Sequence, residues 1–288
     1  MKIAISAEST IDLTKELLKE YDIHTTPFTV SLGNKSGLDG EITSEEIIDY
    51  VSKTNQLPKT SAVNSYQFTE HFKNLLKDYD AVIHFSLSSE MSVACNNARL
   101  AADELENVYV IDTRSLSTGI ALLAIYARKL TLKDIKPAEI VEKVTKRIPT
   151  NQTSFVLSRL DYLYKGGRCN SLSYLASALL KIRPQIVVKD GKMGPRSKYV
   201  GKYDRCIVKY VTDTLESFNT PDLEEIFITS TTATPEQILT VKQMLIERGF
   251  KNIHITNAGA TITSHCGENC LGILYLNDGD ANGEYQEL

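Results

Sequence analysis

The sequence of 288 residues predicts an α/β protein of two domains, with a doubly wound parallel sheet in the N-terminal domain and a mixed sheet in the C-terminal α/β domain. Strand-like and helix-like segments alternate through the first half, which is typical of a parallel sheet covered by helices on both faces. An Asp-Gly turn in the second half indicates a hairpin of antiparallel strands. The polar segment Thr150–Gln152 follows a charged helical segment and predicts a domain boundary. We therefore expect domains at residues 1–152 and 153–288.

The N-terminal domain is predicted from short strand-like runs and longer helical ones. The predicted strands are Lys2–Ser6, Ile23–Val30, Ala81–Ser86 and Val108–Ile111. The predicted helices are Leu13–Glu20, Ser44–Ser52, Tyr66–Leu76, Ser92–Leu105, Leu116–Leu130 and Lys133–Pro149. Thr43 and Glu46 have the spacing of a capping box, which marks the start of the second helix. The apolar run Gly119–Tyr126 predicts a buried helix.

The C-terminal domain is predicted to contain both strand arrangements. Its predicted strands are Ser154–Leu157, Ile226–Thr229, Ile253–Thr256 and Leu271–Tyr275, together with a hairpin over residues 184–194 that turns at Asp190-Gly191. Its predicted helices are Leu172–Leu180 and Pro235–Arg248. Pro235 and Gly249 are residue types typical of the start and end of a helix.

Composition narrows the classes of function. Hydrophobic residues make up 42% of the chain and charged residues 24%, which is typical of a soluble globular protein. The formal net charge of -4 offers no basic face, so we expect no nucleic-acid partner. No secretion signal is recognisable after Met1, and no segment has the roughly 20 apolar residues that span a bilayer. Five cysteines without paired spacing favour a reducing compartment, and we expect a cytoplasmic protein.

Two groups of hydroxyl residues precede predicted helices. Thr60 and Ser61 lie ahead of one helix, and the segment Ser86–Ser92 lies between a buried strand and the next helix. The carboxyl edge of a doubly wound sheet is where ligands bind, and helix amides there favour an anion such as a carboxylate or phosphate. Because serine and threonine are also common N-caps, helix capping is the alternative explanation for each hydroxyl. Glu8 and Asp112 end strands at the same edge, where they would cap helices or orient the hydroxyls.

His265 stands out in a small-residue segment that we expect to be a loop between two strands. Its imidazole would donate a hydrogen bond to a bound carboxylate, or bond a nearby carbonyl in a purely structural role. Cys266 and Cys270 are close in sequence, but no further ligand cluster supports a metal site, so none is expected.

The turn Lys165–Arg168 contains two glycines but has neither the Walker spacing nor the dinucleotide fingerprint. We therefore expect no nucleotide and no cofactor in this chain. Arg168 would bind an anionic partner or be a solvated turn residue.

Taken together, these motifs resemble the DegV family over nearly the whole chain, and specifically the fatty-acid-binding subunits of bacterial fatty acid kinase. The resemblance rests on the order and spacing of several short segments. They are Ile5–Leu13, Leu38–Gly40, Lys59–Ser61, Ser86–Ser92, Val110–Thr113, Leu163–Arg168 and His265–Gly267.

The resemblance implies a DegV-like fold with a fatty acid as ligand, its acyl chain in an apolar tunnel between the domains. It implies that Thr60, Ser92 and His265 bind the carboxylate, with Ser61 as a weaker addition, and that Arg168 serves docking to a kinase subunit. That kinase would supply ATP and metal and would convert the carboxylate to an acyl phosphate. The prediction of partners also includes a transient membrane contact.

Two departures from the family pattern bear on these roles. Val93 stands where the family has a glycine, which predicts a different geometry around the head group. Val200 stands where the resemblance leads us to expect an arginine implied in kinase docking, which favours a lipid-binding regulatory module not coupled to a kinase.

A third hypothesis, a lipase-like or esterase-like hydrolase, would use Ser92 as nucleophile and His265 as base. The sequence around Ser92 lacks the Gly-x-Ser-x-Gly motif that such hydrolases have at their nucleophile.

Overall fold

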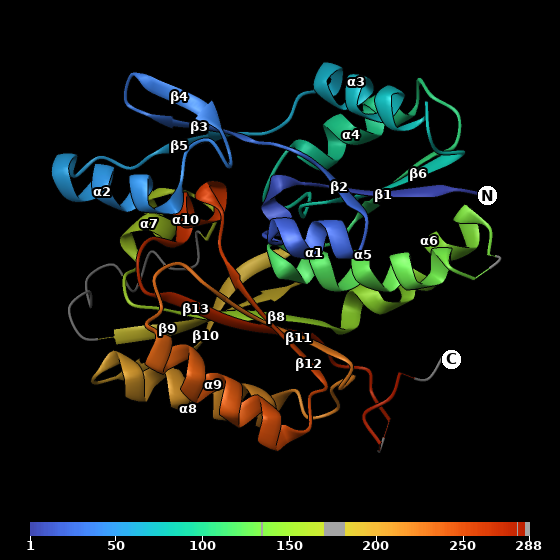
Figure 1. Ribbon diagram of the computed structural model, residues 1–288. Coiled ribbons are helices and arrows are strands. Elements are labelled where there is room, and N and C mark those ends of the chain that lie inside the picture. Colours follow the sequence, from blue (N-terminus) through green and yellow to red (C-terminus); the bar gives the residue numbers. More distant parts are fainter. Residues whose placement is uncertain (134, 170–181, 281, 286–288) are drawn as a thin grey trace.

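The computed structural model describes residues 1–133, 135–169, 182–280 and 282–285. Its N-terminal part is built on a parallel sheet with the strand order β2-β1-β6-β7. The strands are β1 (Ile3–Glu8), β2 (Ile23–Thr26), β6 (Ala81–Ser86) and β7 (Val108–Asp112). The helices α1 (Lys15–Glu20), α5 (Thr118–Thr131) and α6 (Pro137–Arg147) cover one face, and α3 (Ser65–Leu75) and α4 (Ala94–Ala102) cover the other (Figure 1). The predicted doubly wound arrangement is confirmed.

The C-terminal part contains a six-stranded mixed sheet in the order β10-β9-β8-β13-β11-β12. Its strands are β8 (Asn151–Leu157), β9 (Ile182–Lys189), β10 (Lys192–Val200), β11 (Glu225–Ser230), β12 (Asn252–Asn257) and β13 (Cys270–Leu276). The helices are α7 (Asp161–Lys165), α8 (Tyr203–Ser217), α9 (Pro235–Arg248) and α10 (Ala260–Cys266). Among the described strands of this sheet, β11 and β12 pair in parallel and the other neighbours are antiparallel, so the predicted mixed sheet is confirmed.

The predicted hairpin is present as β9 and β10, joined at Asp190-Gly191. Both turn residues have positive φ, 52° and 79°, as a tight hairpin turn between twisted strands requires. Glycine takes this conformation without strain.

A buried helix joins the two sheets. Helix α5 contacts β1 and β6 of the parallel sheet and also β8, β11 and β13 of the mixed sheet. Gly119 to Ile125 are all buried, as the apolar run predicts. One hydrophobic core therefore continues from Ile5 in the first sheet to Leu274 in the second. A second core lies between the mixed sheet and helices α8 and α9. The predicted boundary at residue 152 falls at the start of β8 and stays a prediction.

Two sequence predictions of secondary structure are wrong, and one helix was not predicted. The strand expected over Ile23–Val30 is interrupted at Pro27, which has no N–H to donate to a sheet ladder. The chain then enters a small antiparallel sheet of β3 (Thr29–Leu32), β4 (Lys35–Leu38) and β5 (Lys59–Ser61). Helix α8 was not expected, and the loop expected around His265 is helix α10. The helix predicted over Leu172–Leu180 lies outside the described residues.

The small antiparallel sheet forms its own compact unit with α2 (Ser44–Thr54). Val30, Leu32, Ile42 and Ile47 make a separate apolar cluster, and Ala260 of α10 completes it. The unit therefore packs on the helix that carries His265. None of the helices in the described ranges is both long and apolar enough to cross a membrane.

Candidate functional site

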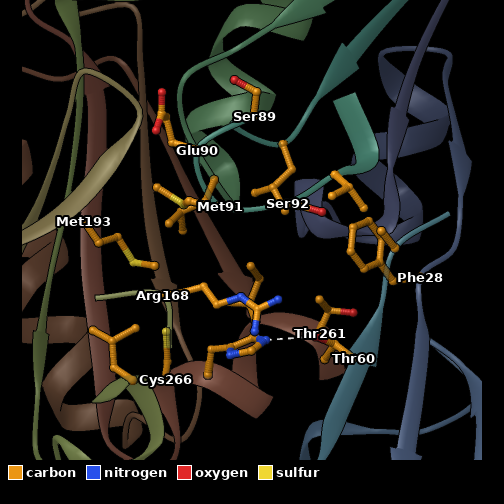
Figure 2. Close-up of a pocket in the computed structure, with 17 residues that line it drawn as sticks. Phe28, Thr60, Ser89, Glu90, Met91, Ser92, Arg168, Met193, Thr261 and Cys266 are labelled. Carbon is orange, nitrogen blue, oxygen red and sulfur yellow. Dashed lines mark hydrogen bonds between the residues drawn. The ribbon is translucent and has the colours of Figure 1, made fainter. Parts of the chain in front are cut away.

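Thr60, Ser92 and His265 line one cavity of about 430 Å³, although they come from three different elements. Thr60 is in β5, Ser92 precedes α4, and His265 is in the last turn of α10. Figure 2 shows Thr60 on one side of this cavity, Met193 on the opposite side and Arg168 between them. The fold thus brings together the three residues that the sequence singled out.

The Thr60 hydroxyl lies 2.9 Å from Nε2 of His265. Burial, and then the positive charge of Arg168, lower the pKa of His265 to about 4, so its imidazole is neutral at pH 7. Among the described residues Nδ1 is buried with no hydrogen-bond partner. An orphaned acceptor is tolerated better than an orphaned N–H, which favours the tautomer with the proton on Nε2. His265 then donates to Thr60, and the Thr60 hydroxyl proton is available to an anion in the cavity.

Ser92 combines the two roles that the sequence left open. Its Oγ accepts the N–H of Ala94, the first residue of α4, at 3.2 Å, and so satisfies a backbone donor at the helix start, although the N-cap position itself is Val93. In the part of the chain that the structure describes, the Ser92 hydroxyl proton has no acceptor. Because a hydroxyl can accept and donate at once, Ser92 can accept the Ala94 N–H and still donate to a ligand.

The structure separates Ser61 from this group. Neighbouring residues of a strand point to opposite faces, and Ser61 is exposed and does not line the cavity, whereas its neighbour Thr60 does. Arg168, expected to bind an anionic partner, to be a solvated turn residue or to serve kinase docking, lines the cavity while staying exposed. Its Nη1 donates to the carbonyl of Gly166 at 2.8 Å. A Cβ at Gly166 would lie 2.7 Å from Nδ1 of His265, so a glycine is needed for this close approach.

The rest of the cavity wall is mainly apolar. Its apolar residues are Phe28, Ala62, Leu87, Met91, Val93, Leu116, Leu163, Met193, Ile262 and Cys266. Met193 belongs to β10 and Phe28 precedes β3, so the wall is shared between the N-terminal and C-terminal parts. Ser89 and Glu90 also line the cavity, away from Thr60 (Figure 2). A cavity of this size with a mainly apolar wall and some polar groups is typical of a small-molecule site.

Two carboxylates at strand ends, Glu8 buried and Asp112 partly buried, fix the loop that carries Ser92. Glu8, at the end of β1, accepts the Ser86 hydroxyl at 2.5 Å and the Leu87 N–H at 2.9 Å. Asp112, at the end of β7, accepts the Ser89 hydroxyl at 2.6 Å. The carboxylates at this edge of the sheet therefore orient hydroxyls, as one of the two sequence hypotheses expected. The strand ends position the loop, and the loop positions Ser92.

Sequence reasoning did not find the residues that hold helix α10. Asp39 accepts the N–H groups of Ala260 and Thr261, at 2.9 and 3.2 Å. Asp12 accepts the N–H of Gly259 at 2.8 Å. The Asp39-Gly40 pair is typical of a turn, and its partners lie more than 200 residues away, so its role could not be recognised from the local sequence. Thr261 also lines the cavity, 3% exposed, with no partner for its hydroxyl among the described residues.

Two other chemistries find no support in the geometry. A serine hydrolase needs its histidine bonded to the nucleophile and oriented by a carboxylate, whereas His265 bonds Thr60 and its other nitrogen has no such partner within the described residues. In the described ranges, no three or more metal-ligating side chains are grouped so that they could hold a metal ion. His265, Cys266 and Cys270 do not form such a group either. All five cysteines are buried, and none of them forms a disulfide in the part of the chain that the structure describes.

The two sheets and the shared cavity define an α/β protein suited to a ligand with a polar head and an apolar body. A family model described as an uncharacterised protein of the DegV family matches residues 2–278. The chain therefore belongs to the DegV family. A DegV domain-containing protein of Caldanaerobacter subterraneus subsp. tengcongensis is 28% identical over 284 residues, covering 95% of this chain and 98% of the relative.

Relatives from Thermotoga maritima have names that refer to fatty acid or lipid binding, and a Thermus thermophilus structure has the same fold. A Thermotoga maritima protein named a fatty acid-binding protein is 28% identical over 281 residues, covering 94% of this chain and 96% of its own. The crystal structure of a DegV lipid-binding protein from that organism has 28% identity and a TM-score of 0.82, covering 96% of this chain and 98% of that one. A Thermus thermophilus DegV structure described by its fatty acid binding has a TM-score of 0.88 at 21% identity. The match covers 96% of this chain and 99% of that one, and it supports the fold.

Proposed function

We propose that this protein binds a long-chain fatty acid in the cavity, with the carboxylate at Thr60, Ser92 and His265. The observation that carries the proposal is the Thr60–His265 hydrogen bond at one place in an otherwise mainly apolar wall. The relatives named for fatty acid or lipid binding support the same ligand class.

The chemistry of the site matches an ionised carboxylate. A buried carboxylate costs several kcal/mol unless its oxygens accept hydrogen bonds. Thr60 and Ser92 each have a hydroxyl proton to donate, and Arg168 adds a positive charge at the cavity. Each buried methylene of the acyl chain contributes about 0.8 kcal/mol. Affinity therefore comes mainly from the tail, and orientation comes from the polar groups.

Lipid retained by the purified protein tests this proposal directly. Mass spectrometry of an organic extract should find fatty acids at near-stoichiometric amounts. After the lipid is removed, added palmitate or oleate should raise the melting temperature because a ligand that binds only the folded state stabilises it. An empty cavity together with no thermal shift would contradict fatty acid binding.

The finer proposal is that the protein presents its ligand to a partner kinase. The carboxylate would attack the γ-phosphorus of ATP held by the partner, forming an acyl phosphate and releasing ADP. Arg168 is exposed beside the head-group site, where it can serve the docking that the family resemblance implies. Val200 is 71% exposed on β10 and offers a partner no charge.

An in vitro phosphorylation assay separates a kinase substrate subunit from an uncoupled lipid-binding module. The lipid-loaded protein is mixed with ATP and the ATP-binding subunit of a bacterial fatty acid kinase. ATP-dependent acyl phosphate supports coupling, and its loss in R168A with the lipid retained assigns Arg168 to that step. Retained lipid with no turnover, restored by V200R, would show instead that Val200 leaves the native protein uncoupled.

A further inference from the structure

The helix that carries His265 is bonded at both ends by the same small sheet. Near its C-terminal end, Thr60 of β5 bonds His265, and at its N-terminal end Asp39, directly after β4, accepts two N–H groups. Strands β4 and β5 are both paired to β3. The separation of Thr60 and His265 is therefore set by one rigid unit that contacts α10 at two places.

Asp39 itself is fixed from several directions. Its Oδ2 accepts the Ser9 hydroxyl at 3.0 Å, and Ser9 Oγ accepts the N–H of Phe28 at 3.1 Å. The N–H of Asp39 donates to the carbonyl of Phe28 at 2.8 Å. Since Phe28 lines the cavity, this network joins the cavity wall to the start of α10.

Helix α10 has no cap of its own. Its N-cap residue is Gly259, which has no side chain to accept a hydrogen bond. A Cβ there would lie 3.1 Å from an oxygen of Asp39 and equally close to one of Asp12, so the glycine admits both carboxyl groups. The capping oxygens thus come from residues more than 200 positions earlier in the chain.

We infer that Asp39 is the positioning residue of the carboxylate site, because it sets helix α10 so that His265 reaches Thr60. This inference rests on the proposed fatty-acid site and assigns to it a residue that does not line the cavity. In D39N the amide nitrogen cannot accept an N–H, so one of the two helix bonds is replaced by two facing donors. Helix α10 then shifts or frays, and His265 loses its fixed distance to Thr60.

A double-mutant cycle on palmitate affinity tests the inference. We expect D39N to weaken palmitate binding about tenfold in the wild-type background, as loss of a charge-assisted bond predicts. In H265A the same change should cost less than about twofold, whereas in S92A the full factor should persist because Ser92 is held by another loop. D49N removes the same charge from an exposed aspartate of α2 and should leave the affinity unchanged.

A ligand-free measurement keeps the inference separate from the proposed function. The His265 imidazole should titrate in NMR spectra with a pKa near 4 in wild type, and this pKa should rise toward the ordinary value in D39N as the ring becomes solvated. If D39N does not fold, S9A, which removes one donor to Asp39, should give a smaller change in the same direction.

The outcomes are distinct. Equal losses for D39N in wild-type and H265A backgrounds, or an unchanged His265 titration in D39N, would overturn the positioning role. Failure of wild-type protein to bind palmitate would overturn the proposed function, and the His265 titration would still decide the role of Asp39.

Discussion

The Thr60 hydroxyl and Nε2 of His265 lie 2.9 Å apart, although 205 positions separate the two residues in the chain. The contact joins the small antiparallel sheet to a helix of the C-terminal part. Both residues line the cavity, so the bond places one polar pair against an otherwise mainly apolar wall. Any ligand with an acceptor head group would meet this pair.

T60V keeps the shape of the side chain and removes its hydroxyl, so it tests the head-group contact. We expect palmitate to bind about 10- to 100-fold more weakly, since a hydrogen bond to a charged group contributes about 1.5–3 kcal/mol. S61A is the matched control because its hydroxyl is next in sequence but exposed. Calorimetric titration of delipidated protein measures both, and equal losses in the two variants would contradict the assignment.

Because of His265, the folded protein should lose stability as the pH falls below about 6.5. Its pKa is lowered to about 4 by burial and then by Arg168, below the unfolded value of about 6.5. The stabilisation is therefore complete above pH 6.5 and is lost as the pH falls toward 4, by up to about 3 kcal/mol. Melting temperatures of wild type and H265Q between pH 4 and 7 should converge as the pH falls. Parallel curves would argue against a buried neutral imidazole.

Asp12 should act in the opposite sense. Burial raises its pKa to about 8, with the charge of Asp39 adding to the effect, although bonds from Ser117 and Gly259 oppose it. Because the folded pKa lies above the unfolded one, Asp12 favours the folded state at low pH and this contribution is lost as the pH rises from about 4 to 8. D12N, which stays neutral, should gain stability relative to wild type across that window. Urea titrations at pH 5, 7 and 9 measure the gain, and D49N should show none.

Gly191 at the tip of the β9–β10 hairpin should resist substitution more than Gly167. Its φ is +79°, and a Cβ would lie 2.7 Å from Ser88 Oγ and 2.8 Å from Nε of Arg114. In G191A the backbone strain costs about 1–2 kcal/mol, and the clash of the new Cβ with Ser88 and Arg114 adds to this cost. Gly167 has a similar φ of +72° with nothing near its Cβ position, so G167A should show the backbone cost alone. Equal free energies of unfolding for G191A and G167A, measured in urea, would refute the contact of Gly191 with Ser88 and Arg114.

Local sequence patterns were sufficient for most of the fold. The alternation of strands and helices predicted the parallel sheet, since a strand buried on both faces is recognisable within a few residues. The Asp-Gly pair predicted the β9–β10 hairpin because its conformation is local. The third sheet was missed because residues 23–30 look like one extended strand in the sequence. In the structure the chain leaves the parallel sheet at Pro27 and joins the small antiparallel sheet. Helix α10 was missed because its cap comes from Asp39 rather than from a neighbouring residue.

For the site, the sequence by itself determined which residue types were available: two hydroxyls before helices and a histidine among small residues. It also left capping and ligand binding open for Ser92, and both fit its final contacts. Only the tertiary structure decided that Thr60 faces the cavity while Ser61 does not, because the register of β5 on β3 selects the face. It alone brought His265 to Thr60, since that distance depends on carboxylates and strands that lie far from His265 in the chain.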